Sequence, residues 1–275
     1  MSAATNSEWR NLLVRIVASG MTPTCRGFKT HESLVSVTHV EMRSPVLTTP
    51  ERKLGYRFMC GEAAWILSGD NRLGTIRKYA KMMERFSDDG VFMSGAYGPK
   101  VVDQLPYILR SLADDHGSRQ AVLTIWRERP GPSKDLPCTI SIQFLIRDGR
   151  LHLVDTMRSS DAWLGVPYDW FTFSMLGAYV CLLLRDHYEV NVQPGLLTLV
   201  AGSQHTYRGG FGYDDDNVVR AITDAGEAFT YKPLDISEFS DADNFVAHLW
   251  DRANGIANGR LRWLGELEDY YASKG

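Results

Sequence analysis

Residues 136–144 read LPCTISIQF, and residues 158–169 read RSSDAWLGVPYD. The first stretch and residues 151–157 are rich in β-branched and apolar side chains, so we expect two strands. Asp148-Gly149 between them is typical of a tight hairpin turn. The second stretch leads into a strongly apolar segment, which we expect to form a buried helix. One unit of strand, hairpin, strand and helix therefore carries a thiol, a guanidinium and two carboxylates.

The remaining segments mix helical and strand-like periodicity. We expect helices over residues 9–18, 54–67, 73–86, 101–112, 168–184, 241–254 and 260–271, and strands over residues 34–42, 120–126, 138–146, 151–157 and 196–200. A polar loop is expected over residues 202–207. No repeat or linker divides the chain, so residues 1–275 are expected to form a single domain. Helices and hairpin-linked strands do not alternate strictly, which favours an α+β fold over a doubly wound sheet.

Composition limits the possible partners. The net charge of −3 gives no reason to expect a nucleic-acid-binding surface, so an anionic ligand must be held by local arginines. The four cysteines lack the spacing of a metal or redox pair, and we expect no metal. The polar first residues lack the apolar core of a signal peptide, and the longest apolar run is about half of a bilayer span. We therefore expect a cytoplasmic protein with free thiols and no membrane partner.

Cys138 is the candidate nucleophile. A thiol needs a nearby cation to ionise at neutral pH, and Arg158 would supply it if the hairpin brings the two strands together. The competing interpretation is that Cys138 is a small buried hydrophobe at the start of a strand. Cys181, inside an apolar helix, fits that second interpretation well.

Arginines and a serine are candidates for holding a phosphate. Arg26 lies in a Gly-containing polar loop, Arg119 follows a Gly-Ser pair, and Arg158 is followed by Ser159. Guanidinium and hydroxyl groups bind phosphate oxygens by charge-assisted hydrogen bonds. Each arginine could equally be a solvated surface residue.

Three further residues could take part in chemistry or binding. Glu62 is a carboxylate within an apolar helical segment, and burial there would raise its pKa and suit it to general acid/base work. The alternative is that Glu62 faces solvent from an amphipathic helix. His205 and Tyr207 could bind hydroxyl groups, or could be ordinary surface residues of a loop.

In their order along residues 8–213, these segments resemble thymidylate synthase and its relatives. The resemblance rests on ordered motifs rather than on a decisive one. The motifs are Arg26-Gly27, Glu62 with Trp65, Ala96-Tyr97-Gly98, Ser118-Arg119, Pro137-Cys138, Arg158-Ser159 with Asp161, residues 164–168, and His205-Thr206-Tyr207. It implies a thymidylate synthase-like fold, in which helices pack on a mixed sheet and a sheet face forms a homodimer interface.

The resemblance also implies a role for each matched residue. Cys138 would add to C6 of a pyrimidine nucleotide, and 5,10-methylenetetrahydrofolate would be the co-substrate. The other implied roles are catalysis for Glu62 and Tyr97, phosphate binding for Arg26, Arg158, Ser159 and the Arg119 of a second subunit, sugar binding for His205 and Tyr207, and folate binding for Asp161 and Gly165.

Asp169 departs from the family pattern, in which thymidylate synthase has asparagine. An asparagine amide pairs with the N3–H and O4 of uracil, whereas cytosine presents an acceptor at N3 and a donor at N4. An aspartic acid can accept from N4 and share a proton with N3. The deoxycytidylate hydroxymethylases of the family carry aspartate here. The resemblance therefore implies deoxycytidine monophosphate (dCMP) as substrate, with Asp169 as a catalytic residue.

Two other departures concern phosphate binding and the product. Gln120 stands where the family usually has a second arginine, and Met83 and Phe86 stand near the places of two tryptophans that shield the one-carbon intermediate. Hydride transfer would give 5-methyl-dCMP, which we expect, and water addition would give 5-hydroxymethyl-dCMP, the alternative. Use of a ribonucleotide, a dUMP-using enzyme and an inactive nucleotide- or RNA-binding relative are further alternatives.

Overall fold

Six strands form one mixed sheet in the order β1-β2-β6-β5-β4-β3 in the computed structural model, which describes residues 2–224, 229–256 and 260–272. Only β5 and β6 run parallel among these pairs. The mixed sheet and the α+β class are as the sequence predicted. The strands are β1 (Thr24–Cys25), β2 (Phe28–Glu41), β3 (Val122–Thr124), β4 (Thr139–Arg147), β5 (Arg150–Asp161) and β6 (Gln193–Tyr207).

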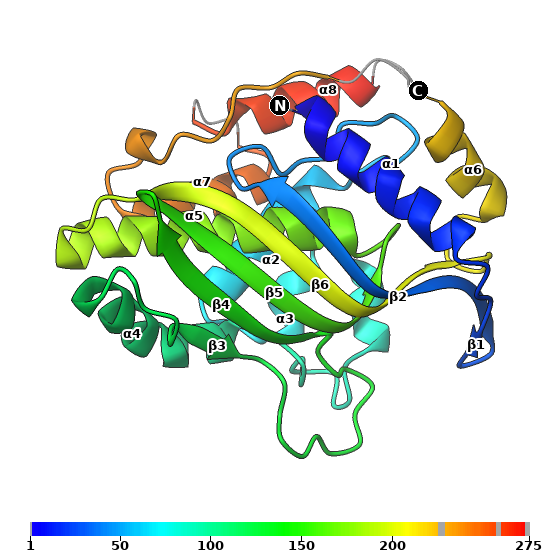
Figure 1. Cartoon of the computed structure of the whole chain (residues 1–275), viewed down its shortest axis with the longest axis horizontal. Coiled ribbons are helices and arrows are strands. Elements are labelled where there is room, and N and C mark those ends of the chain that lie inside the picture. The colour runs from blue at the N-terminus through cyan, green and yellow to red at the C-terminus, as the bar shows by residue number, and fades with distance from the viewer. Residues whose placement is uncertain (1, 225–228, 257–259, 273–275) are drawn as a thin grey trace.

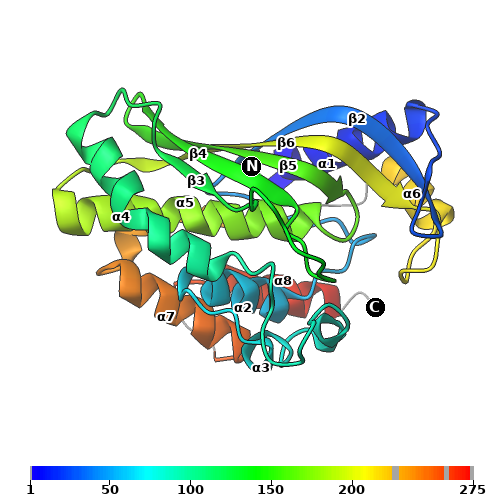
Figure 2. The ribbon, with the colours of Figure 1, turned by 90° about the horizontal axis from the view of Figure 1, so that it is seen from below.

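Helices are layered under one face of this sheet. Figure 2 shows α5 directly beneath the strands and α2, α7 and α8 in a further layer below α5. The helical segments are α1 (Ser2–Ala18), α2 (Tyr56–Leu67), α3 (Leu73–Ile76), η1 (Lys81–Arg85), α4 (Gly98–Asp114), α5 (Val166–Tyr188), α6 (Asp215–Thr223), η2 (Ile236–Glu238), α7 (Ala242–Ala253) and α8 (Arg262–Ala272).

Helix α5 is the centre of the core and connects the two parallel strands. Parallel neighbours need a long crossover, and α5 provides it between β5 and β6. Most of its side chains are buried, including Trp170, Phe171 and Phe173, as the apolar sequence predicted. Gly177 allows close packing, because a Cβ there would lie 2.5 Å from the Met42 sulfur. Among the helices described, none has the length and apolar character that crossing a membrane requires.

The opposite face of the central strands carries no helix in the part of the chain that the structure describes. Figure 1 looks onto this face, with α5 and α2 behind β4, β5 and β6. Several apolar side chains on β2 and β4 are exposed to solvent, among them Leu34, Val35, Val37 and Ile140. Val35 also has a φ of 52°, which is unusual for a β-branched residue.

The prediction of one helix over residues 73–86 is wrong. The chain forms only α3 and the short 3₁₀ turn η1 there. The reason is tertiary packing of Tyr79, whose ring lies so close to Gly61 of α2 that a Cβ on Gly61 would be 2.8 Å away. The Tyr79 hydroxyl also donates a hydrogen bond to Asn254 at 3.0 Å.

The polar loops expected around residues 24–30 and 202–207 are also wrong. Arg26 and Gly27, with φ of 50° and 84°, form the turn of a hairpin between β1 and β2. Strand β6 continues to Tyr207, because both of its neighbours pair with this polar stretch. His205 is opposite Glu32 on β2 and Asp161 on β5.

Candidate active site

Cys138 lies immediately before β4, and the hairpin brings Arg158 of β5 to it. The Arg158 Nη2 atom is 3.8 Å from the Cys138 sulfur, and the Arg158 backbone N–H donates to the Cys138 carbonyl at 2.9 Å. The guanidinium also donates to the carbonyls of Pro137 at 3.0 Å and Leu136 at 3.1 Å. The Cζ atom of the Arg158 guanidinium lies 5.6 Å from the centre of the Trp126 ring. The sequence expectation that the two residues meet is correct.

The thiol of Cys138 is not ionised by this contact alone. Burial is the largest influence and raises its pKa, while the charges of Arg158 and Arg26 lower it and that of Asp169 raises it. The net direction is upward. In the ligand-free chain the residue is therefore a neutral thiol beside a cation, and it must lose a proton before it can attack.

Tyr97 holds the backbone on which Cys138 sits. Its hydroxyl accepts hydrogen bonds from the N–H groups of both Cys138 and Thr139, each at 3.2 Å. The ring stacks on Phe173 of α5, with centroids 6.1 Å apart and planes at 9°. Burial raises the pKa of Tyr97, so the hydroxyl stays neutral. The tyrosine thus links the start of α4, the backbone of Cys138 and the central helix.

Two carboxyl groups, Glu62 of α2 and Asp169 of α5, face the same region. Burial raises the pKa of Glu62 to about 7, and the Thr172 hydroxyl, 3.4 Å away, lowers it. Burial also raises the pKa of Asp169 well above its ordinary value, with further increases from the charges of Glu62, Asp155 and Asp161. These groups cannot all be ionised together in a poorly solvated site. Burial and these neighbouring charges therefore favour the protonated form of Asp169, which could donate a proton.

Gly165 and Asp161 shape the turn that leads into α5. A Cβ on Gly165 would lie 3.2 Å from the Asp161 carbonyl oxygen and 3.3 Å from Asp169 Oδ2, so a larger residue would crowd the acid. Asp161 Oδ1 accepts from the N–H groups of Trp163 and Leu164, both at 2.8 Å. Both bonds use Oδ1, which leaves Oδ2 for a ligand.

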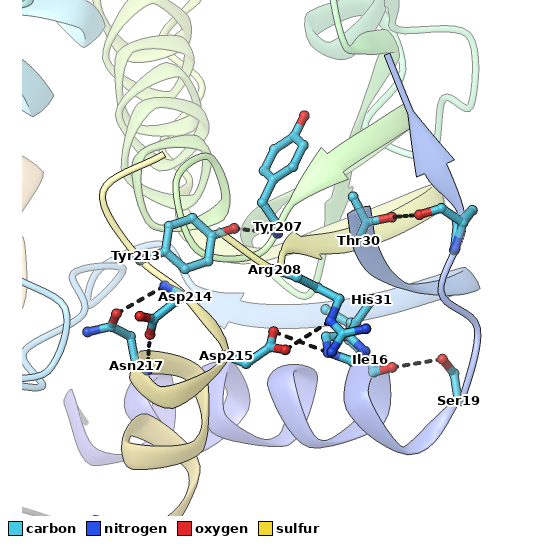
Figure 3. A network of polar contacts seen from close by, with 11 residues as sticks. Ile16, Ser19, Thr30, His31, Tyr207, Arg208, Tyr213, Asp214, Asp215 and Asn217 are labelled. Carbon is cyan, nitrogen blue, oxygen red and sulfur yellow. Dashed lines mark hydrogen bonds and ion pairs between the residues drawn. The ribbon is translucent and has the colours of Figure 1, made fainter. Parts of the chain in front are cut away.

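His205 and Tyr207 project from the last part of β6, with ring centres 5.2 Å apart. The backbone of Tyr207 is held in place by Tyr213, because the Tyr207 N–H donates to the Tyr213 hydroxyl at 2.6 Å. Figure 3 shows this bond beside a second anchor, in which Asp215 binds Arg208 at 2.9 Å and His31 at 3.2 Å. The two anchors tie the end of β6 to the start of α6.

The phosphate candidates divide into two groups. Arg26 lies near the site, because its charge influences the pKa values of both Cys138 and Tyr207, and Ser159 directly follows Arg158 on β5. Arg119 does not join them. Its carbonyl accepts from Gln143 at 2.9 Å, and the residues before it bind Arg147, at the other end of β4 from Cys138.

Sequence reasoning missed Asp155 on β5 and Tyr213. Asp155 is fully buried, and it affects the pKa of Asp169. The sequence did hold a signal, since residue 155 is an acid on the inward-facing side of an otherwise apolar strand. Tyr213 gave no comparable local signal.

The described residues contain no group of three or more His, Cys, Asp or Glu placed to hold a metal ion.

A family model described as "Thymidylate synthase" matches residues 7–223. A deoxyuridylate hydroxymethyltransferase of Pseudomonas phage M6 is 31% identical over 63% of this chain and 50% of its own length. A protein of the same name from Bacillus phage SP01 is 27% identical over 91% of this chain and 70% of its own length. The chain thus spans half the length of the first relative.

Proposed function

The chain belongs to the thymidylate synthase family, and on that basis we propose that it transfers a one-carbon unit from 5,10-methylenetetrahydrofolate to C5 of dCMP. The family assignment supports the reaction type and the folate co-substrate. The relatives carry the printed name deoxyuridylate hydroxymethyltransferase, which supports a pyrimidine nucleotide as the acceptor. The choice of cytosine rests on Asp169.

The position of Asp169 carries the proposal: it lies in the first turn of α5 beside Gly165, where burial and the charge of Glu62 raise its pKa. A neutral carboxyl group has an O–H that can donate to N3 of cytosine and an oxygen that can accept from the N4 amino group. As the Cys138 sulfur adds to C6, negative charge builds up on the ring. Transfer of the Asp169 proton to N3 would neutralise that charge. In uracil N3 already carries a hydrogen, so this route is open only to cytosine.

The remaining side chains bind and orient the nucleotide in this proposal. Arg26, Arg158 and Ser159 hold the 5′-phosphate, and His205 and Tyr207 hold the sugar. Glu62, with a pKa of about 7, exchanges protons with the ring and with water near neutral pH. Asp161 and Gly165 hold the folate, which supplies the one-carbon unit.

Two products are compatible with this chemistry, and we propose 5-methyl-dCMP first. Residues 164–168 keep the thymidylate synthase pattern, which supports a site that still delivers hydride to the transferred carbon. The second candidate is 5-hydroxymethyl-dCMP. The names of both relatives favour it, as does the exposed position of Phe86, where the family pattern has a shielding tryptophan.

We also propose a homodimer built on the uncovered face of the sheet. The exposed apolar residues on β2 and β4 need a partner surface, and a second copy of the chain would cover them. Arg119 lies far from Cys138 within one chain, which is consistent with its reaching the phosphate of a partner's site. The phosphate would then be bound by arginines of both subunits.

The test is turnover of dCMP, dUMP and CMP with carbon-labelled methylenetetrahydrofolate. We expect dCMP to be the preferred substrate, and the mass of the nucleotide product and the formation of dihydrofolate or tetrahydrofolate separate methyl from hydroxymethyl transfer. Asp169→Asn should lose dCMP turnover by about 100-fold or more and gain dUMP turnover, because the amide no longer donates a proton to N3. Preference of the unchanged protein for dUMP would contradict the cytosine assignment.

A further inference from the structure

Asp155 is a buried acid to which the proposed reaction gives no role beyond its influence on the pKa of Asp169. It lies on β5, on the face that packs against α5, between the buried apolar residues Leu153 and Met157. Its side chain is 0% exposed, and neither carboxyl oxygen has a well-formed hydrogen bond in the ligand-free chain. Burying an unpaired acid is unfavourable, and an apolar residue would fit the strand better. The acid therefore needs an explanation.

The polar group that acts on Asp155 is the hydroxyl of Thr139, the residue that follows the nucleophile. Thr139 is also 0% exposed, and its Oγ1 has no well-formed hydrogen bond either. The hydroxyl lowers the pKa of Asp155 as a hydrogen-bond donor does, while burial raises that pKa well above its ordinary value. A protonated carboxyl and a hydroxyl each offer a donor and an acceptor, so the two groups match each other.

Thr139 faces the core because β4 contains a bulge. Thr139 pairs with Met157, but Ser141 pairs with Thr156, so Ile140 is an extra residue on β4. The carbonyl of Ile140 accepts from two N–H groups of the neighbouring segment, at 3.0 and 3.1 Å. A bulge re-aims the residues beside it, and here the residue immediately before Thr139 is Cys138.

We propose that Asp155 and Thr139 form a buried positioning pair that fixes this bulge and so holds the Cys138 sulfur beside Arg158. Tyr97 binds the backbone N–H groups of Cys138 and Thr139 from the side of α4. Asp155 holds the Thr139 side chain from β5. The nucleophile is then constrained from two directions. The inference rests on the proposed function only in taking Cys138 as the nucleophile.

The central variants are Thr139→Val, Asp155→Leu and the double substitution. Replacing both partners by apolar groups of similar shape is nearly neutral or stabilising for the fold, so the double variant is expected to keep its melting temperature. We expect kcat to fall by about 10- to 100-fold in each variant, because a small misplacement of a reacting group is costly. KM for the nucleotide should change by less than about twofold, since the pair does not touch it.

The double variant should be no slower than the slower single variant, because both changes break the same contact. Asp155→Asn should recover most of the activity, since its amide can still donate to the Thr139 hydroxyl. Leu153→Val is the matched control on the same face of β5. We expect it to lower the melting temperature with kcat unchanged. A merely structural role for Asp155 would instead give a kcat close to that of the unchanged protein in a stable double variant, and would overturn the proposal.

A second readout needs neither nucleotide nor folate. Alkylation of Cys138 by iodoacetamide, followed by peptide mass mapping, measures how readily the thiol ionises. We expect alkylation at pH 7 to be several-fold slower in the double variant, because the sulfur moves away from Arg158. An unchanged rate would overturn the positioning role whatever the substrate. An expected rate change together with no dCMP turnover in the unchanged protein would instead sink only the proposed function.

Discussion

Glu62 is the residue whose titration should be visible in both stability and activity. Its pKa rises from 4.5 to about 7 on folding, so the unfolded chain loses this proton first. Between those pH values the folded state binds more protons, and stability must therefore fall as pH rises through this window. Glu62→Gln removes that loss. We expect the free energy of unfolding, measured in urea, to fall less between pH 5 and pH 8 in the variant than in the unchanged protein.

The same substitution should lower kcat/KM by about 100-fold or more if Glu62 exchanges protons with the ring. The pH profile of the unchanged protein should bend near 7, the pKa of Glu62, and the bend should be absent from the variant. Glu189→Gln, at the exposed C-terminal end of α5, serves as a control for the loss of a carboxylate. A profile that keeps its bend in Glu62→Gln would assign the titration to another group.

At the scale of elements, the junction between β6 and α6 should control binding rather than chemistry. The Tyr213 hydroxyl accepts from the Tyr207 N–H at 2.6 Å, and its ring stacks on Trp163 with centroids 5.1 Å apart. Tyr213→Phe keeps the stacking and removes the acceptor. We expect KM for the nucleotide to rise several-fold with little change in kcat, and stability to fall by about 1 kcal/mol.

Steady-state kinetics and thermal unfolding check this prediction. Tyr188→Phe, at the exposed end of α5, is the matched control and should change neither quantity. A fall in kcat with unchanged KM would mean that this junction supports the reacting groups and not the bound sugar.

The elements themselves differ in how far the sequence could predict them. The hairpin of β4 and β5 and helix α5 follow from local apolar patterns, and so does the meeting of Cys138 with Arg158. The end of β6 could not be predicted locally, because its polar residues are held by pairing with both β2 and β5. The false helix over residues 73–86 has the same cause, since the packing of Tyr79 against α2 overrides local propensity.

For the whole molecule, the uncovered sheet face should determine the oligomeric state. Val35 is 75% exposed and has a φ of 52°, a conformation that aspartate tolerates better than valine. Val35→Asp should therefore fold well yet sediment as a monomer in sedimentation velocity experiments, where the unchanged protein is expected to sediment as the proposed dimer. Val219→Asp, at an exposed site on α6, should leave the dimer intact. An unchanged sedimentation coefficient in Val35→Asp would mean that the subunits meet on another surface or that no dimer forms.

If each active site contains Cys138 of one subunit and Arg119 of the other, two inactive variants should complement each other. Cys138→Ser should be inactive because it lacks the thiol, and Arg119→Ala should be nearly inactive because it weakens phosphate binding in the partner's site. Mixing the two under conditions that exchange subunits should restore activity, because one site of each mixed dimer then has both residues. If the mixture is no more active than its components, Arg119 does not act across the interface.

The crossover from β5 through α5 to β6 has a consequence for how this protein could evolve. Arg158 and Asp161 lie at the end of β5, and Asp169 lies at the start of α5. His205 and Tyr207 lie at the end of β6. The residue proposed to recognise the base therefore occupies its own helical turn, separate from the strands proposed to bind phosphate and sugar. Aspartate and asparagine codons differ by a single base. A lineage could thus exchange cytosine for uracil by point mutation while inheriting the rest of the binding site unchanged.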